Sequence, residues 1–109
     1  MGREQEIQQQ ILARLGAVPG LVLWRNNTGA MRDERGQLVR YGQPGSADVL
    51  GLAAPDGRFV ALEIKAPGGK QSELQRAWQQ MVERHGGIDW LVTSVDEARA
   101  GLVRCGIDC

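Results

Sequence analysis

Three charged residues in the middle of the chain interrupt segments that are otherwise apolar. Asp48 lies in the run 46–52, and Glu63 and Lys65 end the run 59–65. If both runs are β-strands, Glu63 and Lys65 share a face, because successive side chains alternate. A weak, solvated ion pair is the simplest reading of these two residues alone. An aspartate in an apolar strand, however, costs free energy unless hydrogen bonds or a cation compensate it, so we expect a partner for Asp48.

Two nearby carboxylates are a ligand set for a hard cation. Asp48 and Glu63, with a backbone carbonyl and water, would suit Mg²⁺ or Mn²⁺, which prefer oxygen ligands. Lys65 beside them would orient an attacking water and stabilise charge that develops on a phosphate group. The chain has two cysteines, Cys105 and Cys109, and one histidine. These are too few for a four-ligand zinc site, and we expect both cysteines to remain thiols.

Length and composition indicate one globular domain spanning residues 1–109. The chain is 42% hydrophobic and 24% charged, which is ordinary for a soluble domain of this size. It contains no apolar run near the roughly 20 residues that cross a bilayer, and its N-terminus lacks the apolar core of a signal peptide. We therefore expect a cytoplasmic protein with no membrane partner.

Positive charge is concentrated around the two carboxylates, although the net charge is zero. Residues 24–46 carry four arginines and two acidic residues, and residues 65–76 carry three basic residues and one acidic residue. Each segment therefore has a net charge of +2. A neutral chain weakly disfavours nucleic acid as a ligand. A random scatter of surface charge explains the two segments equally well.

The predicted elements form a mixed sheet flanked by helices. Periodicity and turn residues predict the order α-β-(hairpin)-β-β-α-β-α, which defines an α/β fold. The third segment is a hairpin or a flap. The expected bounds are 3–15, 21–25, 30–43, 46–52, 59–65, 72–85, 88–93 and 95–104.

The turn Pro55-Asp56-Gly57 predicts that segments 46–52 and 59–65 are antiparallel neighbours. Pairing counted from Asp56 places Glu63 opposite about position 49, one residue away from Asp48. We therefore expect a bulge or a small change of register to bring the two carboxylates to the same face.

Two helix-borne residues point toward the same region. Glu4 falls within the apolar stripe of the first helix, so it faces inward, either for the helix dipole or for a site beneath the helix. Gln75 completes a capping box with Ser72, which gives it a structural role. Its place at the helix start, soon after Lys65, also brings it close to anything bound there.

Together these features resemble the PD-(D/E)xK nuclease superfamily over residues 4–93. The resemblance rests on Gly45-Ser46-Ala47-Asp48, on Glu63-Ile64-Lys65, and on the flanking helices with Glu4 and Gln75. The stretch 65–75, Lys-Ala-Pro-Gly-Gly-Lys-Gln-Ser-Glu-Leu-Gln, and Arg25-Asn26-Asn27-Thr28-Gly29 look most like the VRR-NUC branch in its compact stand-alone phage and bacterial form. Ala47 stands where the superfamily's name has proline, but this branch often lacks that proline.

The resemblance implies a restriction-endonuclease-like fold and metal-dependent hydrolysis of DNA. It implies Asp48, Glu63 and the Ile64 carbonyl as ligands of Mg²⁺ or Mn²⁺, with Lys65 as a catalytic residue. Glu4 would hold a water or a second ion. The helix residue Gln75 would position the lysine or the phosphate.

Stand-alone members of the family look like Holliday-junction resolvases that act as homodimers, which suits two symmetric cuts. A flap or nicking nuclease, a non-catalytic DNA- or protein-binding module, and a plain interaction domain remain alternatives. The candidate phosphate contacts, which are equally well read as solvated surface residues, are Arg25, Arg32, Arg40 and Lys70.

Overall fold

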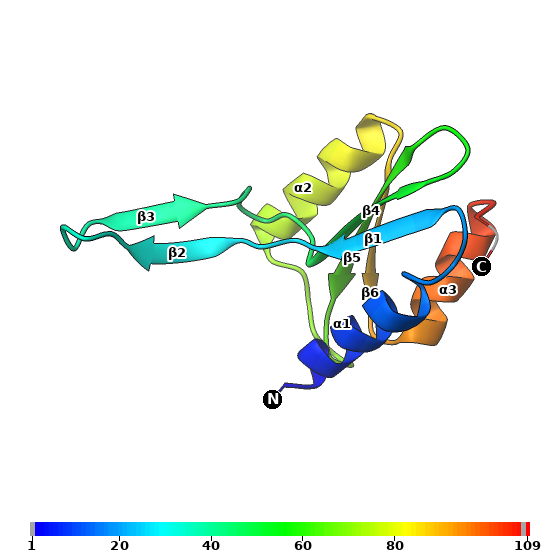
Figure 1. Ribbon diagram of the computed structural model, residues 1–109, viewed down its shortest axis with the longest axis horizontal. Helices are drawn as coiled ribbons and strands as arrows, with labels where there is room; N and C mark the ends of the chain where they lie inside the picture. The colour runs from blue at the N-terminus through cyan, green and yellow to red at the C-terminus, as the bar shows by residue number, and fades with distance from the viewer. Residues whose placement is uncertain (1, 108) are drawn as a thin grey trace.

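The protein, described by a computed structural model over residues 2–107 and 109, is organised around a four-stranded sheet (Figure 1). The strand order is β1-β4-β5-β6, with β1 (Leu21–Arg25), β4 (Val49–Ala53) and β5 (Arg58–Ile64) antiparallel. β6 (Ile88–Val92) pairs with β5 in parallel. The mixed α/β fold predicted from the sequence is confirmed.

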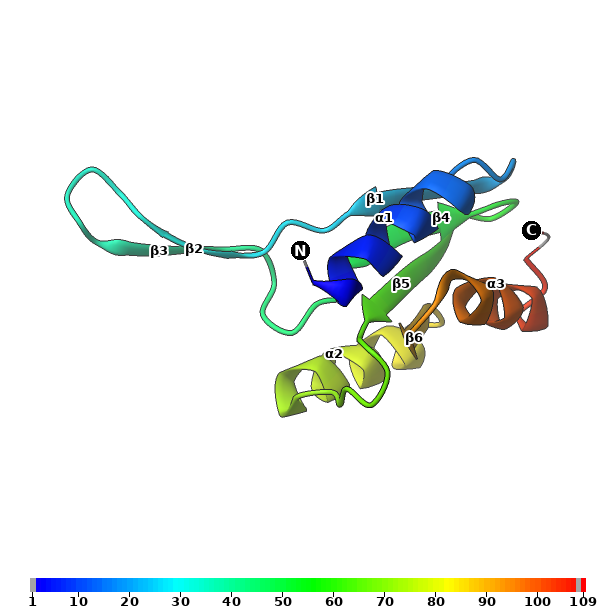
Figure 2. The same cartoon turned by 90° about the horizontal axis from the view of Figure 1, so that it is seen from below.

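Helices cover both faces of the sheet (Figure 2). α1 (Arg3–Arg14) and α3 (Val95–Arg104) pack on one face, and α2 (Glu73–Arg84), which connects β5 to β6, packs on the other. The alternation of β5 side chains follows these two layers, because Val60, Leu62 and Ile64 join the core beneath α1 and α3. The smaller cluster beneath α2 comprises Ala47, Ala61, Trp78 and Val82. Glu63 therefore faces the α2 layer.

The predicted capping box of α2 forms. The Ser72 hydroxyl accepts from the Gln75 backbone N–H at 3.1 Å, and the Gln75 side chain accepts from the Ser72 N–H at 2.8 Å. These two bonds satisfy donors that the first turn of α2 leaves unpaired. At the start of α3 only half of this pattern forms: the Ser94 hydroxyl accepts from the Glu97 N–H at 3.0 Å, and the Glu97 carboxylate accepts from the Thr93 N–H at 3.2 Å.

The third predicted segment is a hairpin that projects from the body of the molecule (Figures 1 and 2). β2 (Gly29–Arg32) and β3 (Leu38–Tyr41) pair only with each other. At its tip the Asp33 carboxylate accepts from the backbone N–H groups of Arg35 and Gln37, both at 2.9 Å. Such a turn is preferred by aspartate, and it gives the exposed hairpin a defined end.

The hairpin has two chemically different faces. Cross-strand pairs share a face, and the register pairs Met31 with Val39 and Ala30 with Arg40. Tyr41 lies opposite Gly29, where a Cβ atom would come within 2.7 Å of the tyrosine hydroxyl. One face is therefore apolar, with Met31, Val39 and Tyr41, and the other carries the arginines Arg32 and Arg40.

No helix among the described residues is long and apolar enough to cross a membrane.

Candidate active site

Asp48 and Glu63 meet without a bulge. β4 pairs Val49 with Leu62, so the next step of the same antiparallel register places Asp48 opposite Glu63. The predicted pairing was therefore wrong by one residue, because the four-residue connection between Ala53 and Arg58 is centred between Pro55 and Asp56. β4 also begins at Val49, later than the predicted position 46.

The Asp48 carboxylate lies at the end of β4 and is held by the neighbouring strand. Its Oδ2 atom accepts from the Ile64 backbone N–H at 2.8 Å, and its side chain also hydrogen-bonds to Glu63. In a strand the N–H and C=O of one residue point to the same edge, so the Ile64 carbonyl points toward Asp48 as well. Three oxygen donors thus come from two adjacent strand ends.

Glu63 is buried, with 4% of its surface exposed. Its pKa is raised to about 8. Burial is the largest cause, followed by the hydrogen bond and the negative charge of Asp48. The positive charge of Lys65 acts in the opposite direction and lowers that pKa. The charge of Lys65 therefore acts on Glu63. The reading of Glu63 as a solvated surface residue is wrong.

Asn26, which the sequence analysis did not single out as a site residue, anchors the segment that carries Asp48. Its side-chain amide donates to the Ser46 hydroxyl at 2.7 Å and to the Ala47 carbonyl at 2.8 Å. Its backbone N–H donates to the Asp48 carbonyl at 2.8 Å. An asparagine directly after a strand is usually read as a turn residue, so only the three-dimensional pairing of β1 and β4 identifies this role.

Gly45 is required by the same segment. Its φ is +78°, and an added Cβ would lie 2.5 Å from the Leu74 carbonyl oxygen at the start of α2. Both the backbone conformation and the close approach favour glycine. Gly45 thereby lets the chain pass the first turn of α2 immediately before Asp48.

Glu4 lies near the site but is not placed with the two paired acids. Its Oε2 atom accepts from the backbone N–H of Ala66 at 3.2 Å, directly after Lys65. In residues 2–107 and 109, no three His, Cys, Asp or Glu side chains form a group that could hold a metal ion. The side chain is exposed, and its observed contact fixes the backbone next to the lysine.

A glutamine pair on the α2 side connects the segment after β5 to β6. The Gln71 amide donates to the Gln79 Oε1 atom at 2.9 Å, and the Gln79 amide donates to the Asp89 carbonyl at 2.7 Å. Gln75 is instead engaged in the α2 capping box. Gln75 was predicted from the sequence to lie in this region, whereas Gln79, one turn further along α2, was missed.

Asp89 is a second buried acid on the face of the sheet that α2 covers. It is 2% exposed, and its Oδ2 atom has no hydrogen-bond partner among the described residues. Burial, followed by the charge of Glu83, raises its pKa to about 7. Asp89 pairs with Ala61, two residues before Glu63, and its charge contributes to the raised pKa of Glu63. An aspartate in the apolar run 88–92 was the signal that could have identified it.

The four candidate phosphate contacts lie in three different places. Arg25 pairs with the core residue Val49 and so points to the α1 side of the sheet. The hairpin residues Arg32 and Arg40 share one face, where the Arg32 guanidinium donates to the Gly36 carbonyl at 2.8 Å. Lys70 is exposed in the segment between β5 and α2.

The carboxyl pair fits a divalent cation. Two acids are held against each other in a buried site, where one proton stays bound well above the ordinary pKa of a glutamate. A cation would replace that proton and relieve the repulsion. Mg²⁺ is typically held by one or two protein carboxylates together with water and substrate phosphate, so the absence of a third acid is compatible with this ion.

A mixed sheet with helices on both faces and a carboxyl pair at its edge defines a nuclease-type fold. The VRR-NUC domain model matches residues 3–97, and the chain belongs to this family. A solved structure described as a VRR_NUC domain superposes with a TM-score of 0.66 at 19% identity, covering 95% of this chain and 97% of the other. No curated protein matches the chain.

Proposed function

We propose that this protein is a metal-dependent, structure-selective DNA endonuclease that hydrolyses phosphodiester bonds. The observation that carries the proposal is the contact of Asp48 with the buried Glu63, on which the positive charge of Lys65 also acts. Membership of the VRR-NUC family supports a nuclease acting on DNA. The substrate preference, the metal and the assembly are part of the proposal.

Asp48, Glu63 and the Ile64 carbonyl would hold Mg²⁺ or Mn²⁺. When bound, such an ion supplies Lewis-acid stabilisation of charge on the phosphate oxygens. The chain's own contribution is to fix the donors, because Asp48 is tied to the Ile64 N–H and its segment is tied to Asn26. A preorganised donor set needs little rearrangement when the substrate binds.

Lys65 is the catalytic cation in this proposal. Its ammonium group orients the attacking water and stabilises the negative charge that develops on the phosphate in the transition state. Glu4 holds the backbone after the lysine through the Ala66 N–H, and the same carboxylate is our candidate for a water or a second ion. The Gln75 oxygen is used by the cap, so its amide nitrogen is the group that would contact the lysine or the phosphate.

We propose a Holliday junction as the substrate and a homodimer as the active form. The amphipathic hairpin supports both parts of this proposal. Arg32 and Arg40 on one face would contact phosphates without reading bases. The opposite face exposes 60% of Met31, 42% of Val39 and 39% of Tyr41. Exposed apolar patches of this kind are typical of protein interfaces.

A flap or nicking nuclease of the same superfamily is the alternative. It would use the same carboxyl pair and lysine, and it differs only in the DNA that it cuts. A non-catalytic DNA- or protein-binding module is the second alternative. The retained set of Asp48, Glu63 and Lys65 argues against that module, because a binding domain needs no paired acids.

One experiment tests the proposal. The protein is incubated with a synthetic four-way junction, a flap and a linear duplex, each with Mg²⁺, Mn²⁺ or EDTA, alongside Asp48→Ala and Lys65→Ala. We expect the junction to be cut only with a divalent ion, and neither variant to cut while both remain folded. Preferential cutting of the flap would favour the alternative substrate. Cleavage that survives in both variants would remove the proposed site.

A further inference from the structure

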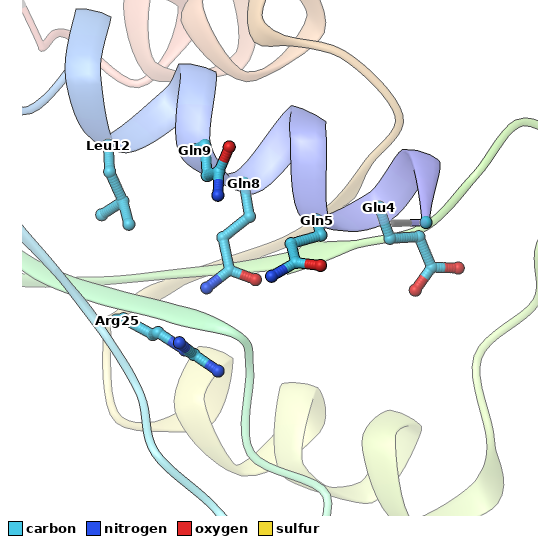
Figure 3. Close-up of a pocket in the computed structure, with 7 residues that line it drawn as sticks. Glu4, Gln5, Gln8, Gln9, Leu12 and Arg25 are labelled. Carbon is cyan, nitrogen blue, oxygen red and sulfur yellow. The ribbon is translucent and has the colours of Figure 1, made fainter.

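A cleft of about 580 Å³ lies between α1 and the edge strand β1 (Figure 3). Its volume is within the range of small-ligand sites, roughly 300–1,000 Å³, and is too small for a duplex to enter. The side chains that line it are Glu4, Gln5, Gln8, Gln9, Leu12 and Arg25. Within the described part of the chain, neither the three glutamine amides nor the Arg25 guanidinium takes part in a hydrogen bond or an ion pair.

The lining follows from the helical period. Gln5, Gln8 and Leu12 recur at intervals of three or four residues, which places them along one side of α1, next to the buried stripe of Ile7 and Ile11. Arg25 extends from β1 into the cleft, because its side chain lies on the same face of the sheet as the core residue Val49, which is the face that α1 covers. Figure 3 shows the Gln5 and Gln8 amides extending from α1 toward the Arg25 side chain.

The cleft has a negative and a positive side chain in its lining, and it adjoins the active site at Glu4. Glu4 stands at one end, and its carboxylate contacts the Ala66 N–H directly after Lys65. Arg25 lies on the opposite wall and is the cleft's cation. A phosphate group would therefore be favoured at Arg25 and repelled at Glu4, which orients any bound nucleotide along the cleft.

We infer that this cleft binds one unpaired nucleotide of the DNA substrate, next to the phosphodiester that is cut. The inference rests on the proposed nuclease function and adds to it that one nucleotide at the branch point leaves its base pair when the DNA binds. Glutamine amides both donate and accept, which matches the edge of a base that has no pairing partner. Arg25 supplies the contact to the adjoining phosphate and can stack on the base.

The binding test uses the full chain in EDTA, so that cleavage does not intervene. Fluorescence anisotropy compares a blunt duplex with the same duplex carrying a single-stranded tail. We expect the protein to prefer the tailed DNA, and each of Gln8→Ala and Arg25→Ala to reduce that preference by about two- to tenfold, the usual worth of a lost hydrogen bond. Gln8→Glu should reduce it further, because a carboxylate repels the phosphate.

Gln10→Ala is the matched control. Gln10 is exposed on α1 but does not line the cleft, so this variant should keep the full preference for tailed DNA. Alanine is the best helix former, so neither glutamine-to-alanine change should unfold α1. Circular dichroism melting checks that point.

The outcomes separate this inference from the proposed function. Equal binding of tailed and blunt DNA, or an unchanged preference in Gln8→Ala and Arg25→Ala, would overturn the inference even if branched DNA is still cut in Mg²⁺. If the protein prefers tailed DNA and the two variants reduce that preference, the inferred role of the cleft is supported. This holds even if the protein cuts none of the DNAs. In that last case only the nuclease proposal fails.

Discussion

Asp48 and Glu63 stand one step beyond the Val49–Leu62 pair that ends the β4–β5 register, and the two side chains share a hydrogen bond. The contact requires a proton on one of the two carboxyls or a cation between them. Most of the consequences that can be measured follow from this choice, because Glu63 is buried and water screens its repulsion with Asp48 poorly.

Without metal, the protein should lose stability as the pH rises. The pKa of Glu63 is raised from 4.5 to about 8 in the folded state, so between these values the folded protein holds a proton that the unfolded chain lacks. The free energy of unfolding therefore falls across this range and levels off above it. Asp89, raised from 3.8 to about 7, acts in the same direction.

Glu63→Gln tests that dependence. The variant should lose the part of the slope that Glu63 causes and should be more stable than the wild type above about pH 8, by a few kcal/mol at most, since one pKa unit corresponds to about 1.4 kcal/mol. Urea unfolding in EDTA at several pH values measures this. Glu6→Gln, at an exposed position of α1, should retain the wild-type slope. An identical slope in Glu63→Gln would contradict the buried pair.

Mg²⁺ or Mn²⁺ should stabilise the folded protein through the same two acids. A ligand at 100 times its Kd contributes about 2.7 kcal/mol, and each kcal/mol raises the Tm of a domain of this size by about 4–8 °C. Asp48→Asn should abolish the rise in Tm. Asp56→Asn, in the exposed turn between β4 and β5, should keep it. An equal rise in both variants would place the ion elsewhere.

The position of the acids was partly predictable. Alternation along 59–65 correctly separated Glu63 from the core residues Leu62 and Ile64, and the Pro55-Asp56-Gly57 turn correctly made β4 and β5 neighbours. The register could not be fixed from the sequence, because a shift of one residue depends on where the turn is centred. An aspartate in an apolar run was the correct signal at Asp48.

The rest depended on contacts between segments far apart in the chain. Asn26 reaches Ser46 and Ala47, twenty or more residues away, only because β1 pairs with β4. Gln79 is one turn beyond the capping residue Gln75, and only the packing of α2 on β6 brings it to Asp89. Local sequence patterns identify the residues that cap a helix, but they do not identify which residues of other elements the following helical turn contacts.

Lys65→Ala should impair the chemical step rather than binding of the metal. Loss of one group that stabilises transition-state charge typically lowers kcat by about 100- to 1,000-fold. The rise in Tm on adding Mg²⁺ should persist, since both carboxylates remain. Lys70→Ala, five residues further along, should raise KM with little change in kcat, as expected for a phosphate contact. Single-turnover cleavage separates the two effects, and equal kinetics in both variants would argue against a catalytic role for Lys65.

Asn26→Ala should disorder the segment that carries Asp48. The change removes two side-chain hydrogen bonds and leaves the Ala47 carbonyl with one partner fewer, at a cost of about 1–3 kcal/mol. We expect a lower Tm and weaker stabilisation by Mg²⁺. Asn27→Ala provides the control at the neighbouring exposed position. If both asparagine variants behave like the wild type, Asn26 does not position the site.

The apolar face of the hairpin should hold the proposed dimer together. Val39→Glu places a charge between Met31 and Tyr41 on that face, where burial in an interface would be strongly unfavourable. Leu38→Glu introduces the same charge one residue earlier, on the face that carries Arg32 and Arg40. Light scattering should find a dimer for the wild type and for Leu38→Glu, and a monomer for Val39→Glu. A monomeric wild type at micromolar concentration would count against paired cutting of a junction and would leave a flap or nicking enzyme as the better reading of the site.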